Sequence, residues 1–152
     1  MSLPFPPSEY MSRALELARA AAEAGEVPIG AVIVRRGVVI AEGENRNRRD
    51  KDPTAHAEIV AIRAAADRLG DFRLTDCELW VTLEPCAMCA GAISHARIDR
   101  LYFGAQDPKG GGVDHGARIF THPQCLYRPE VYGGIGEGAS AALLRGFFAV
   151  RR

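Results

Sequence analysis

The chain has 152 residues, a length typical of one domain. Hydrophobic residues make up 47% and charged residues 25%, which excludes the compositions of disordered, collagen-like and coiled-coil proteins. Nineteen Lys and Arg balance nineteen Asp and Glu, so the net charge excludes a strongly basic protein, and a nucleic-acid partner would have to meet a local patch. Residues 1–44 hold six acids and four bases, whereas residues 118–152 hold two acids and five bases. The net charge of zero is therefore the sum of segments with opposite net charges.

The predicted elements take their bounds from apolar periodicity and from capping and turn residues. In chain order they are an irregular segment 1–7, a helix 8–25, strands 29–34 and 38–41 joined by a turn, a surface loop 43–53, a helix 54–70, a strand 79–83, a helix 86–96, a strand 100–104, a long loop 105–125 with fragments of helix, a short strand 129–132 and a helix 139–150. This alternation predicts one domain, residues 1–152, in which a sheet carries helices on both faces.

Particular residues set the expected ends and buried faces of these helices. Ser8 and Thr54 are the expected N-caps of the first two helices, and Gly25 and Gly70 are their expected ends. The expected apolar face of the second helix is Ile59, Ile62, Ala66 and Leu69, and that of the last helix is Leu143, Leu144, Phe147 and Phe148. The apolar runs of the first two strands lack polar alternation, which predicts strands buried on both faces.

The four cysteines, at positions 77, 86, 89 and 125, are too few and too unevenly spaced for the disulfide framework of a small secreted domain. No apolar signal segment precedes them, and no apolar run approaches the roughly 20 residues of a membrane span. We therefore expect a soluble, cytoplasmic protein with reduced thiols and no membrane partner.

Two short motifs contain the residue types of a metal-dependent active site. His56-Ala57-Glu58 stands at one predicted helix start, and Pro85-Cys86-Ala87-Met88-Cys89 stands at another. Two cysteines three apart on a helix project from one face, and the helix N-terminus favours the thiolate form. If the two helix starts face each other, His56 supplies the third ligand of a catalytic zinc site whose fourth position stays open for water. Glu58 would then reach that water without binding the metal.

Two other interpretations of the cysteine pair stay open at this point. It is a thiol redox pair in some proteins, and a structural zinc site would close its fourth position with Cys77, Cys125 or another His. Such a closed site has no use for Glu58, which seen alone would be an ordinary solvated residue in a first helical turn.

His-Ala-Glu followed by Pro-Cys-x-x-Cys resembles the zinc-dependent nucleobase deaminase superfamily. Within it, the chain resembles the bacterial tRNA-specific adenosine deaminases over most of its length, from about residue 8 to 152. The matching segments are Val27-Pro28-Ile29-Gly30-Ala31-Val32, Asn45, His56-Ala57-Glu58-Ile59, Thr82-Leu83-Glu84-Pro85-Cys86-Ala87-Met88-Cys89, Gly91-Ala92-Ile93, Gly104-Ala105 with Asp107 and Lys109, and Phe147-Phe148 followed by Arg151-Arg152.

The resemblance implies a cytidine deaminase-like fold, which is a three-layer α/β/α sandwich around a mixed sheet of about five strands. It implies one Zn²⁺ per subunit, bound by His56, Cys86 and Cys89, and no organic cofactor. The implied reaction is hydrolysis of adenosine to inosine and ammonia at the wobble position of a tRNA anticodon. Glu58 acts in it as general base and then as general acid.

The resemblance also implies where substrate and partners bind. The residues expected beside the base, with Asn45 as its reader, are Ile29, Gly30, Ala31, Asn45, Ala57, Glu84 and Pro85. The expected contacts to a tRNA anticodon stem-loop are Arg46, Arg48, Asp107, Lys109, Phe148, Arg151 and Arg152, with Arg49 and Lys51 as further candidates for phosphate. We expect a homodimer, because one small domain gains a wide RNA-binding surface only by pairing with a second copy.

The sequence departs from this branch mainly at residues 110–136. Gly110-Gly111-Gly112 and His115 replace the more usual residues after the Lys, and Tyr127-Arg128-Pro129 replaces the usual residues before the last strand. Since this segment borders the substrate side in the family, a small-molecule deaminase of guanine, cytosine or a related base is the second hypothesis. A zinc-stabilised binding module without catalysis is the third.

Overall fold

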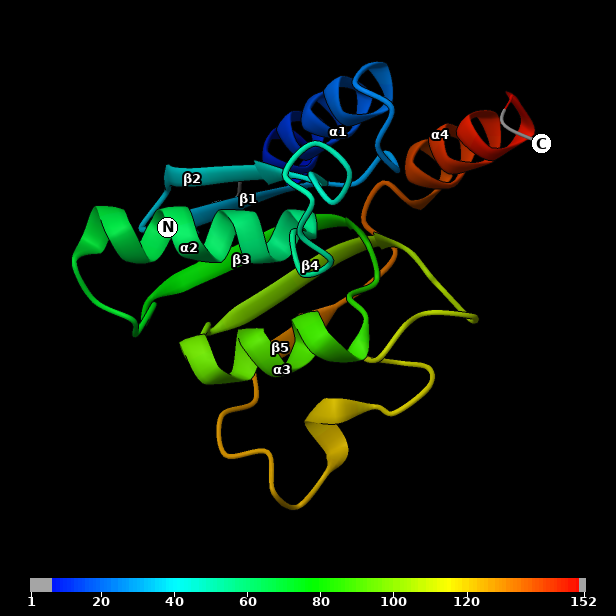
Figure 1. Cartoon of the computed structure of the whole chain (residues 1–152). Coiled ribbons are helices and arrows are strands. Elements are labelled where there is room, and N and C mark those ends of the chain that lie inside the picture. Colours follow the sequence, from blue (N-terminus) through cyan, green and yellow to red (C-terminus); the bar gives the residue numbers. More distant parts are fainter. Residues whose placement is uncertain (1–6, 151–152) are drawn as a thin grey trace.

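The computed structural model describes residues 7–150, in which one mixed sheet lies between two pairs of helices (Figure 1). The helices are α1 (Pro7–Glu23), α2 (Ala57–Leu69), α3 (Ala87–Ala96) and α4 (Glu137–Val150), the strands are β1 (Gly30–Arg35), β2 (Val38–Glu44), β3 (Cys77–Leu83), β4 (Arg100–Ala105) and β5 (Glu130–Tyr132), and Ile119–Thr121 form a 3₁₀ turn. No helix among these residues has the length and apolar character to cross a membrane.

The sheet has the strand order β2-β1-β3-β4-β5. Strand β1 is antiparallel to both of its neighbours, whereas β3, β4 and β5 run parallel. Strands β2, β3 and β4 therefore point in one direction, and the loops that follow them leave the sheet at one edge. The predicted three-layer α/β/α sandwich with about five mixed strands is confirmed.

The two faces of the sheet bury different side chains, as the alternation of a strand requires. Leu79 and Val81 of β3 belong to the core under α2 and α3, while Trp80 belongs to the core under α1 with Leu143 of α4 packed against it. Strand β1 is buried along almost its whole length, as predicted. The same prediction is wrong for β2, which is an edge strand with Val38 55% exposed.

The β1–β2 hairpin is held between two helices that approach it very closely. A Cβ atom at Gly30 would meet the backbone of Ala14 and Ala18 in α1, and a Cβ atom at Gly43 would meet the backbone of Ala57 and Ala61 in α2. Small residues therefore form the stripe of α2 that is buried deepest, Ala57, Ala61 and Ala65. The predicted apolar face of this helix is therefore wrong. Ile62, Ala66 and Leu69 are only partly buried and pack at the margin of the core.

Gly43→Ala is expected to destabilise the fold by about 1–3 kcal/mol, the usual cost of overpacking. The new Cβ atom would lie 2.7 Å from the Ala61 amide nitrogen, which is helix backbone and yields poorly. Urea unfolding measures the change. The matched control is Gly146→Ala in α4, where no atom lies within 4 Å and alanine favours the helix. Equal stabilities of the two variants would contradict this close approach.

Two helix boundaries differ from the sequence predictions. Helix α1 begins at Pro7, where a proline needs no N–H partner, so the prediction of Ser8 as its N-cap is wrong. Helix α4 begins at Glu137, and Phe147 is buried while Phe148 is 47% exposed, so only part of its apolar stripe is core. The predicted irregular segment before Pro7 lies outside the described residues.

Candidate active site

The three candidate metal ligands lie at the starts of two helices on the same face of the sheet. His56 is the N-cap residue of α2 and Cys86 that of α3, and both have extended backbone conformations. Neither side chain caps its own helix, which leaves both available to an ion. Cys89 lies in the first turn of α3 and is fully buried.

The distances among these ligands suit a tetrahedral zinc ion. The Nδ1 atom of His56 lies 3.5 Å from the Sγ atoms of both Cys86 and Cys89, and all three ligand atoms lie within 4.8 Å of one another. Zinc bonds of about 2.0–2.3 Å at tetrahedral angles separate a nitrogen and a sulfur ligand by roughly 3.5 Å. This set therefore fits zinc bound through His56 Nδ1. No other such group of ligands occurs within residues 7–150.

The pKa values of the two thiols shift in opposite directions. A hydrogen bond from Cys89, with the nearby His56, lowers the pKa of Cys86 to about 4 although burial opposes the change. The same hydrogen bond and burial raise the pKa of Cys89. Negative charge is therefore already present between the two helix starts, where a cation can neutralise it.

Glu58 is a buried carboxylate next to this centre. It is 4% exposed in the first turn of α2. Burial, with the negative charge of Cys86, raises the pKa of Glu58 to about 7, while hydrogen bonding and His56 oppose the rise. A carboxyl group with this pKa both accepts and releases a proton near neutral pH, which general acid–base chemistry requires.

Asn45 follows β2 and reaches the start of α2. Its Oδ1 atom accepts a hydrogen bond of 2.9 Å from the N–H of Ala57, and its side chain is buried. Since this bond uses the oxygen, Nδ2 is the group that Asn45 can present to a ligand. The bond also replaces the predicted cap: Thr54 lies before the helix and bonds to Asp52 instead, so its assignment as N-cap is wrong.

The other residues expected beside the base occupy different positions. The carbonyl of Ile29 accepts a hydrogen bond from the Asn45 N–H, which places this backbone at the site. Ala31 lies in the core under α2 and α3, on the same face as the metal ligands. A Cβ atom at Gly30 would face α1 on the opposite side of the sheet, so this position packs closely against that helix.

Glu84 has no exposed side-chain area and holds the loop that follows β4. Its two oxygens accept hydrogen bonds of 2.9–3.2 Å from the backbone N–H groups of Asp107, Val113, Asp114 and His115, and His115 Nδ1 lies 2.7 Å from Oε1. Burial raises the pKa of Glu84, but these hydrogen bonds outweigh it and lower the pKa. Pro85 next to it is buried and accepts a hydrogen bond from Gly112. Glu84 thus fixes the conformation of this loop, and its oxygens are occupied by the loop's own donors.

Glu84→Gln is expected to destabilise the protein by about 1–3 kcal/mol, because an amide cannot satisfy all these donors and some stay buried without a partner. Amide hydrogen exchange in residues 107–115 should also accelerate in the variant. Glu130→Gln is the control, since its exposed carboxylate accepts one hydrogen bond from Tyr132. An exchange rate in 107–115 equal to that of the parent would contradict this role of Glu84.

The charged residues expected to meet RNA lie in the loops after β2 and β4. Arg46 pairs with Asp50, while the side chain of Arg48 is exposed with no ion pair within residues 7–150. Lys109 is exposed, and Asp107 accepts backbone hydrogen bonds within its own loop. Phe148 is exposed on α4, and Arg151 and Arg152 lie outside the described residues. The loop after β2 leads directly to His56, and the loop after β4 contacts the segment that bears Cys86 through the bond from Gly112 N–H to the Pro85 carbonyl.

Sequence reasoning missed two residues that shape these loops. Glu26, 1% exposed, accepts hydrogen bonds from the loop after β2, and His115 contacts Glu84. An isolated acid directly before an apolar strand is a signal that was available for Glu26. For His115 the signal was only its departure from the family pattern.

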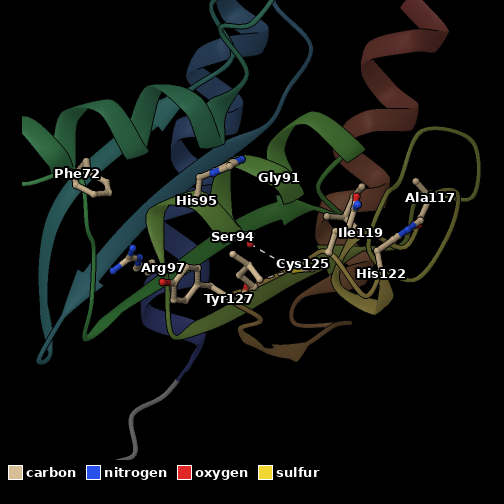
Figure 2. Close-up of a pocket in the computed structure, with 12 residues that line it drawn as sticks. Phe72, Gly91, Ser94, His95, Arg97, Ala117, Ile119, His122, Cys125 and Tyr127 are labelled. Atoms are coloured by element: carbon tan, nitrogen blue, oxygen red, sulfur yellow. Dashed lines mark hydrogen bonds between the residues drawn. The ribbon is translucent and has the colours of Figure 1, made fainter.

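A cavity of about 490 Å³ lies beside α3 and the 117–127 segment (Figure 2). Its lining includes Phe72, His95, Arg97, Ile119, Leu126 and Tyr127. The Arg97 guanidinium lies 4.3 Å from the centre of the Tyr127 ring and 5.8 Å from that of Phe72. Neither the three ligands nor Glu58 line this cavity, so it is distinct from the metal centre.

Comparison with known proteins identifies similar chains. Residues 6–105 match the family model of the cytidine and deoxycytidylate deaminase zinc-binding region. A tRNA-specific adenosine deaminase of Agrobacterium fabrum is 56% identical over 145 residues, which are 95% of this chain and 95% of that protein.

Solved structures have the same fold. One, from biochemical and structural studies of A-to-I editing by tRNA:A34 deaminases at the wobble position of transfer RNA, has a TM-score of 0.89 and 56% identity over 90% of this chain and 99% of that chain. A guanine deaminase from Nitrosomonas europaea has a TM-score of 0.84 and 29% identity over 97% of this chain and 87% of that chain.

Proposed function

Because the chain belongs to the cytidine and deoxycytidylate deaminase zinc-binding family, we propose that it deaminates a nucleobase by hydrolysis, and that the base is adenosine at the wobble position of a tRNA anticodon. Water and adenosine give inosine and ammonia. The observation that carries the choice of substrate is 56% identity over 95% of both chains to a tRNA-specific adenosine deaminase. A guanine deaminase from Nitrosomonas europaea is 29% identical over 97% of this chain, and one from Bacillus subtilis is 45% identical over 67% of it. Both fall below the 56% identity over 95% of the chain to the tRNA-specific enzyme, which favours adenosine in tRNA over a free base.

His56 Nδ1, Cys86 and Cys89 would hold one zinc ion per subunit, since their spacing and the charge on the thiols fit that ion. Zinc with three protein ligands supplies an acidic water at neutral pH. The chain's own contribution is to fix the ligands, because both helix starts are tied to strands of one sheet. No organic cofactor is needed for this reaction.

Glu58 would move the protons. Its carboxylate accepts a proton from the water whose oxygen bonds to C6 of adenine, and it passes a proton to the ring nitrogen N1. It then takes the proton of the new hydroxyl group on C6 and supplies it to the amino group, so that the C6=O bond forms as the C6–N6 bond breaks and ammonia leaves. One buried carboxyl group with a pKa of about 7 suits both directions of transfer.

Asn45 would orient the base. Its Oδ1 is occupied by Ala57 N–H, so Nδ2 donates to an acceptor on the purine ring. The target nucleotide must be unpaired and turned out of its stack to reach such a buried centre, and the loop of a tRNA anticodon offers such nucleotides. Arg46, Arg48 and Lys109, in the loops after β2 and β4, would meet the phosphates around it.

We also propose that the enzyme is a cytoplasmic homodimer. Phe72, Leu126 and Tyr127 at the cavity beside α3 are all exposed, by 64%, 79% and 41%, and a second copy would bury them. Light scattering should give twice the mass of one chain. A monomer mass at micromolar concentration would contradict the dimer.

The deciding experiment for the substrate measures ammonia release from tRNA anticodon stem-loops, guanine, cytosine and cytidine. Inosine at the wobble position and turnover restricted to RNA are expected. Catalysis on RNA should also weaken steeply as salt rises, because neutralising phosphates releases counterions. Turnover of guanine with none on RNA would transfer the assignment to a small-molecule deaminase. Full zinc occupancy with no turnover on any substrate would favour a binding module.

A further inference from the structure

Arg49 differs from the other cations of the loop between β2 and α2. Its Nη2 donates hydrogen bonds of 2.9 Å to Glu44 Oε2 and 2.6 Å to the carbonyl oxygen of Asn45, and its Nε donates one of 3.2 Å to Glu26 Oε2. The Arg49 side chain is 28% exposed and pairs with two carboxylates, whereas the Arg48 side chain beside it has no ion pair within residues 7–150. The Arg49 guanidinium is therefore directed toward Glu26, Glu44 and the Asn45 carbonyl.

Glu26 is the buried anchor of this arrangement. Its side chain is 2% exposed, and its carboxylate accepts hydrogen bonds of 3.1 Å from the Arg48 N–H and 2.8 Å from the Arg49 N–H besides the guanidinium contact. Burial raises the pKa of Glu26, but these hydrogen bonds and the Arg49 charge outweigh it and lower the pKa. The donors to this buried charge, Arg48 N–H and Arg49 N–H and Nε, thus come from one loop, which Glu26 holds against the segment before β1.

The same loop carries Asn45, which is fixed at three points. Its N–H donates to the Ile29 carbonyl at 3.2 Å, its Oδ1 accepts from the Ala57 N–H, and its own carbonyl accepts from Arg49. The Ala57 contact leads directly to the helix start that bears His56. Arg49 therefore joins the buried Glu26 to the residue that would read the base.

We propose that Arg49, held by Glu26, is a positioning residue that fixes Asn45 for the reaction, and that it is not a phosphate contact. This inference rests on the proposed function, in which Asn45 orients the adenine. Two carboxylates, Glu26 and Glu44, already neutralise the Arg49 charge, which leaves little of it for RNA. A fork of planar donors can reach several fixed acceptors at once, which an ammonium group cannot do in the same way.

The test compares Arg49→Ala, Arg49→Lys and Glu26→Gln under single-turnover conditions on a tRNA anticodon stem-loop, with zinc content measured for each. The maximal rate of Arg49→Ala should fall by at least about tenfold, since small displacements of orienting groups cost up to about 10²-fold. The half-saturating concentration and the dependence on salt should stay near the parental values. Arg49→Lys should recover part of the rate, and the double variant Arg49→Ala with Glu26→Gln should fall little below the worse single variant.

Arg13 and Glu42 provide the matched control pair. They also form an Arg–carboxylate pair with two hydrogen bonds, of 2.6 and 2.8 Å, but they join α1 to β2 on an exposed surface. Arg13→Ala should keep the maximal rate within about twofold, because an exposed pair contributes little to stability. A loss as large as that of Arg49→Ala would mean that any such pair matters and would overturn the specific role.

A phosphate contact gives the opposite result. Arg49→Ala would then keep its maximal rate, raise the half-saturating concentration and reduce the salt slope by about one, and the proposal would be overturned. If Arg49→Ala holds less zinc than the parent, the maximal rate of Arg49→Lys becomes the deciding measurement. A parental rate of Arg49→Lys then overturns the proposal.

Amide hydrogen exchange of the free enzyme separates this proposal from the proposed function. Residues 44–57 should exchange faster in Arg49→Ala than in the parent, with or without RNA. No turnover by the parent on any stem-loop would refute the proposed substrate, while unchanged exchange in residues 44–57 would refute the positioning role.

Discussion

Glu58→Gln is expected to lose turnover on a tRNA stem-loop by about 10²- to 10⁴-fold, the usual range for removal of a general acid–base group. The amide has the shape of the carboxyl group but cannot take a proton from water and return it. One residue would serve several proton transfers, so the loss should lie toward the upper end of this range. Glu58→Ala should lose at least as much.

Zinc content separates this effect from loss of the metal site. Glu58 is not among the three ligand atoms that converge, so the variant should hold zinc at the parental stoichiometry. Glu137→Gln is the control, because Glu137 is also in the first turn of a helix but is exposed on α4. A zinc-replete Glu58→Gln enzyme that works at the parental rate would show that another group moves the protons.

Removal of zinc by a chelator is expected to abolish turnover and to lower the melting temperature. The ligands come from the starts of two helices, so an ion bound there links α2 to α3 in the folded state only. An ion present at 100 times its dissociation constant adds about 2.7 kcal/mol to the free energy of unfolding. Readdition of zinc should restore both activity and stability.

Cys86→Ser tests the same site without a chelator. The variant should lose zinc and turnover together, since one thiolate ligand is missing. Cys125→Ser is the control, because Cys125 lies in the segment beside the cavity and is not one of the grouped ligands. Full activity of the Cys86→Ser enzyme, or of the parent after metal analysis finds no bound metal, would exclude a metal-dependent reaction.

Periodicity was sufficient to predict the order of helices and strands, and spacing predicted that Cys86 and Cys89 share a face of one helix. That His56 joins them depended on the two helix starts facing each other and was implied by the family resemblance. The elements are long enough to show their apolar periods, and the ligands stand at helix starts whose positions the pattern fixes. The boundaries failed where a distant group takes over a local role. Asn45, twelve positions away, supplies the acceptor for the start of α2 that Thr54 was expected to supply.

The roles of Glu26, Glu84 and Arg49 were not predictable from the sequence. Each depends on a hydrogen bond between segments more than twenty positions apart, in loops that have no periodicity. A residue type alone did not distinguish an arginine turned toward a buried carboxylate from one turned toward solvent. The sequence therefore identified which loops matter and left open what each side chain in them contacts.

Because β2, β3 and β4 run in one direction, the metal-binding segment and the loops proposed to select the substrate lie at one edge of the sheet. The loops that leave these three strands carry Asn45, the Glu84 to Cys89 segment and the 107–115 segment, while the cores lie beneath them on the two faces of the sheet. The third of these loops also reaches into the core, because Val113 is buried there and Glu84 holds the backbone of residues 107–115. A protein engineer who wishes to change the accepted base would therefore vary the exposed side chains of the first and third loops and keep Asn45, Glu84, Val113 and the metal-binding helix starts.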